Sequence, residues 1–191
     1  MYLGSIYSLL LINNNIMNEI TFGFVKPDAY QHRKEILEEF ILPIGLSIIL
    51  EKDPYFFTEE IARRHYREHR EKKRIFEIIT LFTVYGIHDL DASRQEKTRL
   101  PTALYVFEGD GALERLRKIT GPTDPAAARA MAVKTGIPTI RSKYGIGMPD
   151  NAFHSSDSYE SVRRETILHF KREELPKYVL EMLDKKPYKM N

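Results

Sequence analysis

The order of secondary-structure patterns is the feature that most constrains the fold of this 191-residue chain. Four runs have the apolar or alternating pattern typical of strands, at 20–25, 46–50, 102–107 and 152–154. Helical patterns occupy 34–42, 58–70, 73–85, a short run after Asp110, an Ala-rich turn up to Val133, 159–170 and 175–183. The order β-α-β-α-α-β-α-β-α predicts an α/β (α+β) domain with a ferredoxin-like split βαβ topology, in which helices cover a four-stranded antiparallel sheet, mainly on one face.

Breaking and capping residues indicate where the first elements begin and end. Pro27 ends the first strand directly after Lys26, so Lys26 is expected at a strand end. Thr58 is expected to cap the helix that follows the second strand, although Ile61 stands where a capping box needs Glu or Gln.

Later in the chain, Asp110 is expected to cap the short helix after the third strand. Asp157 and Glu160 together predict a capping box at the start of the helix over 159–170. Residues 86–100 are interpreted as an exposed loop or short helix, and 139–149 as irregular.

Composition and length place the chain among folded domains with one core. Charged residues make up 29% and hydrophobic residues 42% of the sequence. We expect one domain over 18–171, an N-terminal extension over 1–17 and a C-terminal helical tail over 172–191. The net charge of +2 argues against a protein that binds nucleic acid mainly through bulk electrostatics.

No targeting signal is expected in the N-terminal segment. The apolar run within 2–16 is too short to span a bilayer and has no basic residue before it, so neither a membrane helix nor a signal peptide is expected. Met17 is an alternative start. The chain has no cysteine, which fits a reducing compartment, and the cytoplasm is the expected location.

His154 stands at the end of the last predicted strand, just before a capped helix. The free N–H groups and the macrodipole at a helix N-terminus favour an anion, so a phosphate on this imidazole would face a favourable field. Alone, the pattern also fits an ordinary histidine beside a capping sequence.

A second histidine pattern, His65-x-x-Glu68-His69, has the spacing of an inverted zinc-protease motif. The match is short, it lies in a run dense in charge, and no third ligand is evident. We therefore interpret it as a solvated helix face and predict no metal site in the protein.

Five motifs, taken in order along the chain, carry a resemblance to a known family. They are Lys26-Pro27-Asp28, His65-Tyr66-Arg67-Glu68-His69, Gly121-Pro122-Thr123-Asp124-Pro125, Thr139-Ile140-Arg141 and Asn151-x-x-His154-x-Ser156-Asp157-Ser158-x-Glu160-Ser161. They resemble the motifs of nucleoside diphosphate kinases over about residues 20–170. The resemblance implies ping-pong transfer of a γ-phosphoryl group from a nucleoside triphosphate to a nucleoside diphosphate through a phosphohistidine.

By position, the resemblance implies that His154 is the nucleophile and Glu165 the carboxylate that holds its second nitrogen. A solvated helix glutamate is the ordinary alternative for Glu165. Ser156 would bond the carboxylate, and a role as helix cap is equally compatible with it. Tyr66 would lie beside the histidine and the phosphates. A histidine of ordinary basicity is largely neutral at pH 7, which suits a covalent carrier.

The resemblance also implies a nucleotide site. Its expected phosphate-binding cations are Lys26, Arg117 and Arg141, its phosphate-binding hydroxyl is Thr123, its sugar contact is Asn151, and its base-stacking position falls on Ile75 or Phe76. Mg²⁺ is expected to bind through the nucleotide's phosphates, which requires no dedicated protein ligands.

Several positions depart from the family pattern. Ser155 stands where glycine is usual after the histidine, and a positive φ there would cost on the order of 1 kcal/mol and displace His154. Ala29 follows Lys-Pro-Asp in place of glycine. The segments 86–100 and 125–138 are longer than usual. A homo-oligomer is expected, either the hexamer of the family or, if the second segment blocks its contacts, a dimer or tetramer.

Two other functions remain open from the sequence. One is a nucleotide-binding interaction module of the same fold with weak or no kinase activity, favoured by Ser155, the long segments and the basic tail. The other is an RNA-recognition fold, although no strand carries the paired aromatic residues of its signature.

Overall fold

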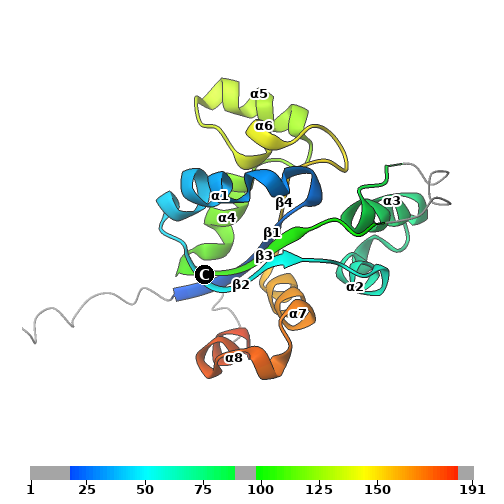
Figure 1. Ribbon diagram of the computed structural model, residues 1–191. Coiled ribbons are helices and arrows are strands. Elements are labelled where there is room, and N and C mark those ends of the chain that lie inside the picture. The colour runs from blue at the N-terminus through cyan, green and yellow to red at the C-terminus, as the bar shows by residue number, and fades with distance from the viewer. Residues whose placement is uncertain (1–17, 89–97, 185–191) are drawn as a thin grey trace, which may run out of the picture.

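The computed structural model describes residues 18–88 and 98–184 and contains one four-stranded sheet (Figure 1). Its strands are β1 (Asn18–Val25), β2 (Ser47–Tyr55), β3 (Thr102–Asp110) and β4 (Phe153–Ser155). The strand order is β2-β3-β1-β4 and every neighbouring pair is antiparallel. The predicted fold class is therefore confirmed. The strand β2 continues past the predicted end at 50, because it is an edge strand whose register shift between Lys52 and Tyr55 accommodates Pro54.

The helices follow the predicted order with one addition. They are α1 (Arg33–Ile36), α2 (Glu59–His65), α3 (Lys73–Tyr85), α4 (Ala112–Thr120), α5 (Pro125–Thr135), α6 (Ile140–Tyr144), α7 (Tyr159–His169) and α8 (Lys177–Asp184). Short 3-10 or π turns occupy Pro27–His32, Leu37–Ile41, Leu42–Ile44, Arg67–His69 and Arg172–Glu174. The Ala-rich turn is a full helix, α5, and α6 was not predicted.

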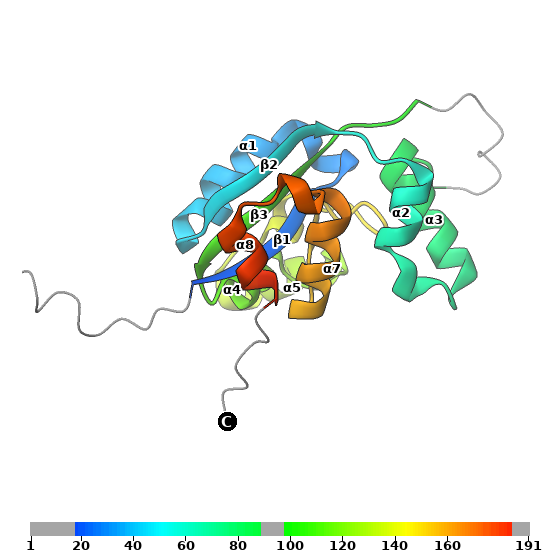
Figure 2. The same ribbon diagram turned by 90° about the horizontal axis from the view of Figure 1, so that it is seen from below.

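Helices cover both faces of the sheet, so the expectation that they lie mainly on one face is wrong (Figures 1 and 2). On one face, Phe22 and Phe24 pack with residues of α2, α3, α7 and α8. On the other, Tyr105 and Phe107 pack with residues of α1, α4 and α6. Both faces are apolar because β3 places large apolar side chains on each of them in alternation.

Two of the predicted helix starts are wrong by one residue. Ser158, not Asp157, caps α7, and its hydroxyl accepts a hydrogen bond from the Ser161 amide (3.2 Å). Asp157 instead accepts from the Ser161 hydroxyl (2.6 Å). Asp110 ends β3 rather than capping α4, because Gly111 follows it with φ +58°.

The cap predicted at Thr58 is confirmed, since its hydroxyl accepts from the Ile61 amide (3.2 Å). The segment 139–149 is not wholly irregular. Thr139 and Ser142 form a capping box that begins the short helix α6.

The predicted domain division set apart the two ends of the chain, 1–17 and 172–191. The N-terminal extension and residues 89–97 lie outside the described residues. The described part of the C-terminal tail contains α8, whose Val179 and Leu183 belong to the core beside α7. No helix within 18–88 and 98–184 has the length and apolarity that a bilayer crossing requires.

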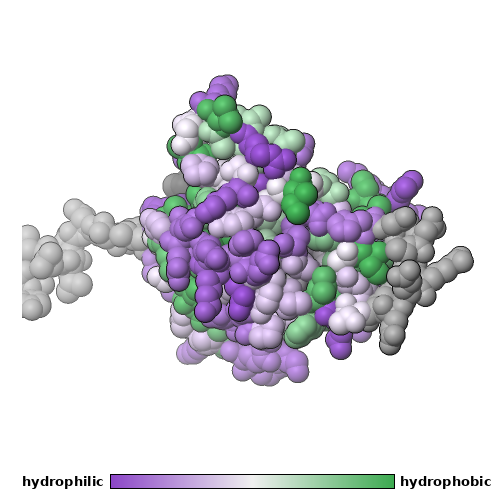
Figure 3. Space-filling view, turned by 45° about the horizontal axis from the view of Figure 1, so that its top comes forward, coloured by the Kyte–Doolittle hydropathy of each residue, from purple (hydrophilic) through white to green (hydrophobic). Residues whose placement is uncertain are grey.

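The part of the molecule that carries α5 and α6 projects from the sheet (Figure 1), and apolar side chains stand among polar ones on its surface (Figure 3). Val133, Ile137 and Ile146 are more than half exposed there. This projection comprises the predicted long segment 125–138, and it forms one wall above the end of β4.

Candidate active site

A cavity of about 410 Å³ lies where β1 and β4 end, between the α2–α3 pair and the segment from α4 to α6. The residues predicted from the sequence that line it are Lys26, Tyr66, Arg117, Thr123, Arg141, Asn151, His154 and Glu165. Ser156 is buried behind them and contacts Glu165. Residues separated by more than 120 positions thus meet at one site.

His154 lies in β4, with its ring against the sheet. Its Nε2 is 2.9 Å from Oε2 of Glu165. The ring stacks on Phe24 at 5.0 Å between centroids, and the His65 ring meets it at 4.6 Å and 71°. Burial, together with the charges of Lys26 and Arg141, holds the pKa of His154 well below its ordinary value, so the ring is neutral at pH 7.

Glu165 comes from α7 and is 1% exposed. Its Oε2 accepts from Ser156 Oγ (2.7 Å) as well as from His154, and its Oε1 accepts from Arg164 (2.9 Å). Burial raises the pKa of this carboxyl group, while the three donors favour its ionised form. An ionised acceptor on Nε2 places the ring hydrogen of His154 there and leaves the lone pair on Nδ1.

Lys26 occupies the end of β1, as Pro27 predicted. Its Nζ donates to the carbonyl of Pro149 (2.9 Å) and to Oδ1 of Asn151 (2.7 Å). Burial lowers its pKa to about 8, although Asp28 opposes the shift. Asp28 in turn accepts from the amide of Ala152 (2.9 Å). The ammonium group is therefore held in place at the cavity, and burial makes its charged form less stable than it would be in water.

The two arginines approach from the opposite wall. Arg141 in α6 donates to the carbonyls of Gly121 (3.0 Å) and Phe153 (2.9 Å), and its buried Nε has no partner. Burial and the nearby Arg117 lower the pKa of Arg141 to about 10. Arg117 is exposed at the end of α4 and donates to the carbonyl of Ser156 (3.4 Å). Both guanidinium groups keep N–H donors for an anion.

Three further predicted residues line the same cavity. The amide of Asn151 accepts from Lys26 and donates to the carbonyl of Thr123 (2.9 Å), so it already joins two walls of the site. The side chain of Thr123 lies on the exposed rim. The hydroxyl of Tyr66 accepts from Thr83 (3.1 Å) and can still donate.

Ser155 and Ala29, which stand where the family pattern has glycine, show no backbone strain. Ser155 pairs with Gly23 in the sheet, and Ala152 is the one non-glycine residue of the described ranges with positive φ (+65°). The condition for strain at Ser155 is therefore not met. Ala29 is buried in the core and also has ordinary backbone geometry.

Neither residue expected to stack on the base lines the cavity. Phe76 is 8% exposed in the core, beneath the guanidinium of Arg63, and Ile75 is 50% exposed on the outer surface. Sequence reasoning missed His69 and Ile79, which do line the cavity. His69 belongs to two of the quoted motifs but received no binding role from them, and no local signal marks Ile79, because the angle between α2 and α3 decides which side chains face inward.

The interpretation of His65 as part of a solvated helix face is wrong, since this side chain is 1% exposed. Its motif partner Glu68 binds Arg164 (2.6 Å) and does not join it in a ligand set. Within the described residues, the His65, His154 and Glu165 side chains form one group whose ligand atoms lie within 4.8 Å of one another.

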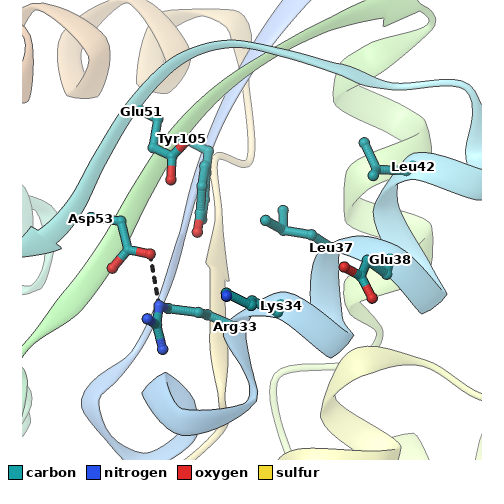
Figure 4. A pocket seen from close by; sticks show the side chains of 8 residues that line it. All are labelled: Arg33, Lys34, Leu37, Glu38, Leu42, Glu51, Asp53 and Tyr105. Atoms are coloured by element: carbon teal, nitrogen blue, oxygen red, sulfur yellow. Dashed lines mark hydrogen bonds and ion pairs between the residues drawn. The ribbon is translucent and has the colours of Figure 1, made fainter.

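A second cavity, of about 290 Å³, lies between α1 and the edge formed by β2 and β3 (Figure 4). The Arg33–Asp53 ion pair (2.7 Å) forms part of the wall of this cavity, and the Tyr105 hydroxyl points into the cavity. It contains none of the predicted site residues.

A neutral histidine nitrogen beside cationic side chains in a cavity suits phosphoryl transfer. Comparison with known proteins agrees: a family model described as Nucleoside diphosphate kinase matches residues 19–175. A nucleoside diphosphate kinase of Methanosphaera stadtmanae is 34% identical over 166 residues, which span 86% of this chain and 93% of that relative. The corresponding kinase of Pyrococcus horikoshii is 36% identical over 166 residues, with 84% and 90% covered.

A solved structure of the Aquifex aeolicus nucleoside diphosphate kinase superposes with a TM-score of 0.65 at 32% identity, covering 83% of this chain and 99% of that one. The chain therefore belongs to the nucleoside diphosphate kinase family. The predicted resemblance is confirmed, and the protein is an enzyme of phosphoryl transfer. The alternative of a nucleotide-binding module with weak or no kinase activity is not favoured.

Proposed function

We propose that this protein moves the γ-phosphoryl group of a nucleoside triphosphate to a nucleoside diphosphate, with His154 as the covalent carrier. The hydrogen bond from His154 Nε2 to Glu165 supports this proposal most directly, because it leaves the Nδ1 lone pair for attack. Nδ1 attacks the γ-phosphorus, the bond to the bridging oxygen breaks, and the diphosphate leaves. A terminal oxygen of a second diphosphate then takes the phosphoryl group, and the electron pair returns to Nδ1.

The remaining predicted residues have roles that fit this reaction. Lys26, Arg117 and Arg141 would neutralise the phosphate charge, Tyr66 and Thr123 would donate hydroxyl hydrogen bonds to phosphate, and Asn151 would contact the sugar. Ser156 and Glu165 would hold the histidine. For the base, the structure favours His69 and Ile79 over Ile75 and Phe76.

Mg²⁺ fits this site only together with a nucleotide. The carboxylate nearest to the histidine, Glu165, is already bound by three donors, and the phosphate-facing wall is cationic. A cation would therefore be held by phosphate oxygens, where it would neutralise charge on the transferred group. Treatment with EDTA should abolish transfer, and added Mg²⁺ should restore it.

Assembly, location and domain division remain predictions. We expect a homo-oligomer, with the projection of α5 and α6 deciding between a hexamer and a dimer or tetramer. Light scattering coupled to size exclusion measures this directly. The cytoplasm and the absence of membrane and nucleic-acid partners remain expectations, as does the division into 1–17, 18–171 and 172–191.

The test of the function is incubation of the purified chain with γ-labelled ATP. Acid-labile, base-stable label should appear on the wild type, should be absent from His154→Ala, and should be released by any nucleoside diphosphate. ADP binding without label on the wild type would refute the proposal in favour of the binding module.

A further inference from the structure

A chain of three polar side chains, of which the two histidines are buried, runs from the edge of the sheet to His154. The hydroxyl of Tyr55 lies 3.3 Å from Nδ1 of His169, and Nε2 of His169 lies 3.0 Å from Nδ1 of His65. His169 is 3% and His65 1% exposed, and apolar rings surround both. Neither the transfer reaction nor the packing of the core explains why the imidazole rings of His65 and His169 lie among apolar side chains.

Hydrogen-bond chemistry limits this chain to two arrangements. Burial lowers the pKa of His169 to about 3 and that of His65 well below its ordinary value, so each ring is neutral and carries one hydrogen at pH 7. If the Tyr55 hydroxyl donates, His169 donates from Nε2 and His65 carries its hydrogen on Nε2. If Tyr55 accepts, every hydrogen moves to the other nitrogen, and Nε2 of His65 has a lone pair.

The carboxylate of Glu165 selects between the two arrangements. Nε2 of His65 is buried and has no hydrogen-bond partner. A ring nitrogen of His65 lies within 4.8 Å of a Glu165 oxygen and of a His154 nitrogen. Since Nδ1 of His65 is occupied by His169, Nε2 is the nitrogen open to Glu165. A nearby negative charge attracts an N–H group and repels a lone pair, so this carboxylate favours the arrangement in which Tyr55 donates.

The His65 ring also restricts how His154 can turn. Its plane meets the His154 ring at 71°, and Phe24 stacks on the same imidazole. The reactive ring is thus in contact with two others, while Glu165 holds its Nε2.

We propose that His65 is a positioning residue for the His154–Glu165 pair, with its Nδ1 held by the His169–Tyr55 pair and its hydrogen on Nε2. The inference rests on the proposed function, because it assigns His65 to the step in which His154 takes the phosphoryl group. As Nδ1 bonds to phosphorus, positive charge grows on the ring, and an ionised, correctly oriented Glu165 stabilises it. The His65 N–H group favours that ionised carboxylate, and its ring keeps Nδ1 directed at the cavity.

The test combines variants of this chain with a direct view of the tautomer. His65→Phe removes both nitrogens, whereas His65→Gln keeps an acceptor for His169 and a donor toward Glu165. His169→Phe and Tyr55→Phe interrupt the chain farther from the site and keep an aromatic ring. Val179→Ala serves as the matched control, because it truncates a side chain of the same core cluster and removes none of the chain's polar groups.

In single-turnover labelling, His65→Phe should slow phosphorylation of His154 by about threefold or more, because it removes an N–H dipole near the Glu165 charge rather than a direct hydrogen bond. The KM for nucleotide should stay within about twofold, since His65 would not contact it. His65→Gln should recover most of the rate, and His169→Phe should fall between them. Nitrogen NMR of labelled wild type should place the His65 hydrogen on Nε2, and His169→Phe should change this signal.

A labelling rate in His65→Phe equal to that of Val179→Ala overturns the proposal, as does a wild-type His65 hydrogen on Nδ1. If His65→Phe does not fold, the same decision falls to His169→Phe, whose rate must then differ from that of Val179→Ala. An unlabelled wild type would overturn the proposed function as well, whereas a labelled wild type matched by His65→Phe overturns this inference alone.

Discussion

Replacing Glu165 by glutamine tests whether the carboxylate sets the tautomer of the carrier. Glutamine keeps the shape of the side chain but offers one acceptor oxygen and one amino group. If the oxygen faces His154 and Ser156, the amino group faces the donors of Arg164. If the amide turns, the amino group faces Nε2 of His154, and the ring hydrogen must move to Nδ1, the nitrogen that should attack.

The geometry sets the size of the effect. The substitution removes the charge from one hydrogen bond to His154, and such bonds contribute about 1.5–3 kcal/mol. Because about 1.4 kcal/mol corresponds to a factor of ten, phosphorylation of His154 in Glu165→Gln should be roughly 10- to 100-fold slower. Arg164 keeps its second partner Glu68 (2.6 Å), so the loss should come from the histidine rather than from an unpaired arginine.

The assay is rapid-quench labelling by γ-labelled ATP under single-turnover conditions, with ADP affinity measured separately. Glu174→Gln is the control, because this carboxylate forms a partly exposed ion pair with Lys52 and does not line the cavity. It should stay within about threefold of wild type, as expected for such an ion pair. Equal rates for Glu165→Gln and wild type, or equal losses in both variants, would show that the carboxylate does not control the tautomer.

Three further predictions follow from the same structure. Burial lowers the pKa of Lys26 to about 8, so this cation is lost as pH rises and kcat/KM should fall above about pH 8. Lys26→Arg should raise the pH at which kcat/KM falls, and a pH profile unchanged by the substitution would contradict this reasoning. Burial lowers the pKa of His169 to about 3 in the folded state against about 6.5 unfolded, so the unfolded state binds the extra proton between these values and stability decreases as the pH is lowered from about 6.5 to about 3. In urea titrations His169→Phe should weaken this dependence by up to about 1.4 kcal/mol per pH unit, and an unchanged slope would oppose it. Gly121→Ala should lower the free energy of unfolding by about 1–3 kcal/mol, because φ is +84° and the new Cβ would lie 2.8 Å from Cβ of Thr139. Gly136→Ala, with φ +71° and open space, should cost less, and equal losses in thermal unfolding would disprove the role of the contact.

The fold could be predicted from the sequence because strand and helix periodicities are strong and regularly spaced. The wrong expectation that helices lie mainly on one face came from β1, where small and polar residues such as Thr21 and Gly23 alternate with phenylalanines. The strand β3 held the missing information, since its Ala103, Tyr105 and Phe107 make the second face apolar. The helix α6 was missed because five residues are too few for a periodicity to be recognised.

The position of a site residue was predictable where a strand-ending or helix-capping residue marks it in the sequence. It was not predictable where the packing of helices decides which side chains face the cavity. Lys26 and His154 lie at strand ends that Pro27 and the capped helix mark in the sequence. The side chains that face the cavity from α3 depend on how α2 and α3 meet, which no local pattern records. The burial of His65 was hidden by the charged residues around it, because only tertiary packing separates its face of α2 from the solvated one.

One physical cause, the burial of the side chains around the cavity, underlies the states of both the cations and the carrier. It lowers the pKa of Lys26 to about 8 and that of Arg141 to about 10, so each cation is held at a free-energy cost that a bound phosphate would offset. Burial and these same cations keep His154 neutral, which preserves the lone pair on Nδ1. An anion entering the cavity would therefore stabilise the cations and remove part of the field that disfavours positive charge on the imidazole. The histidine would thus tolerate positive charge better when a phosphoryl group is present, which is the stage at which transfer requires it.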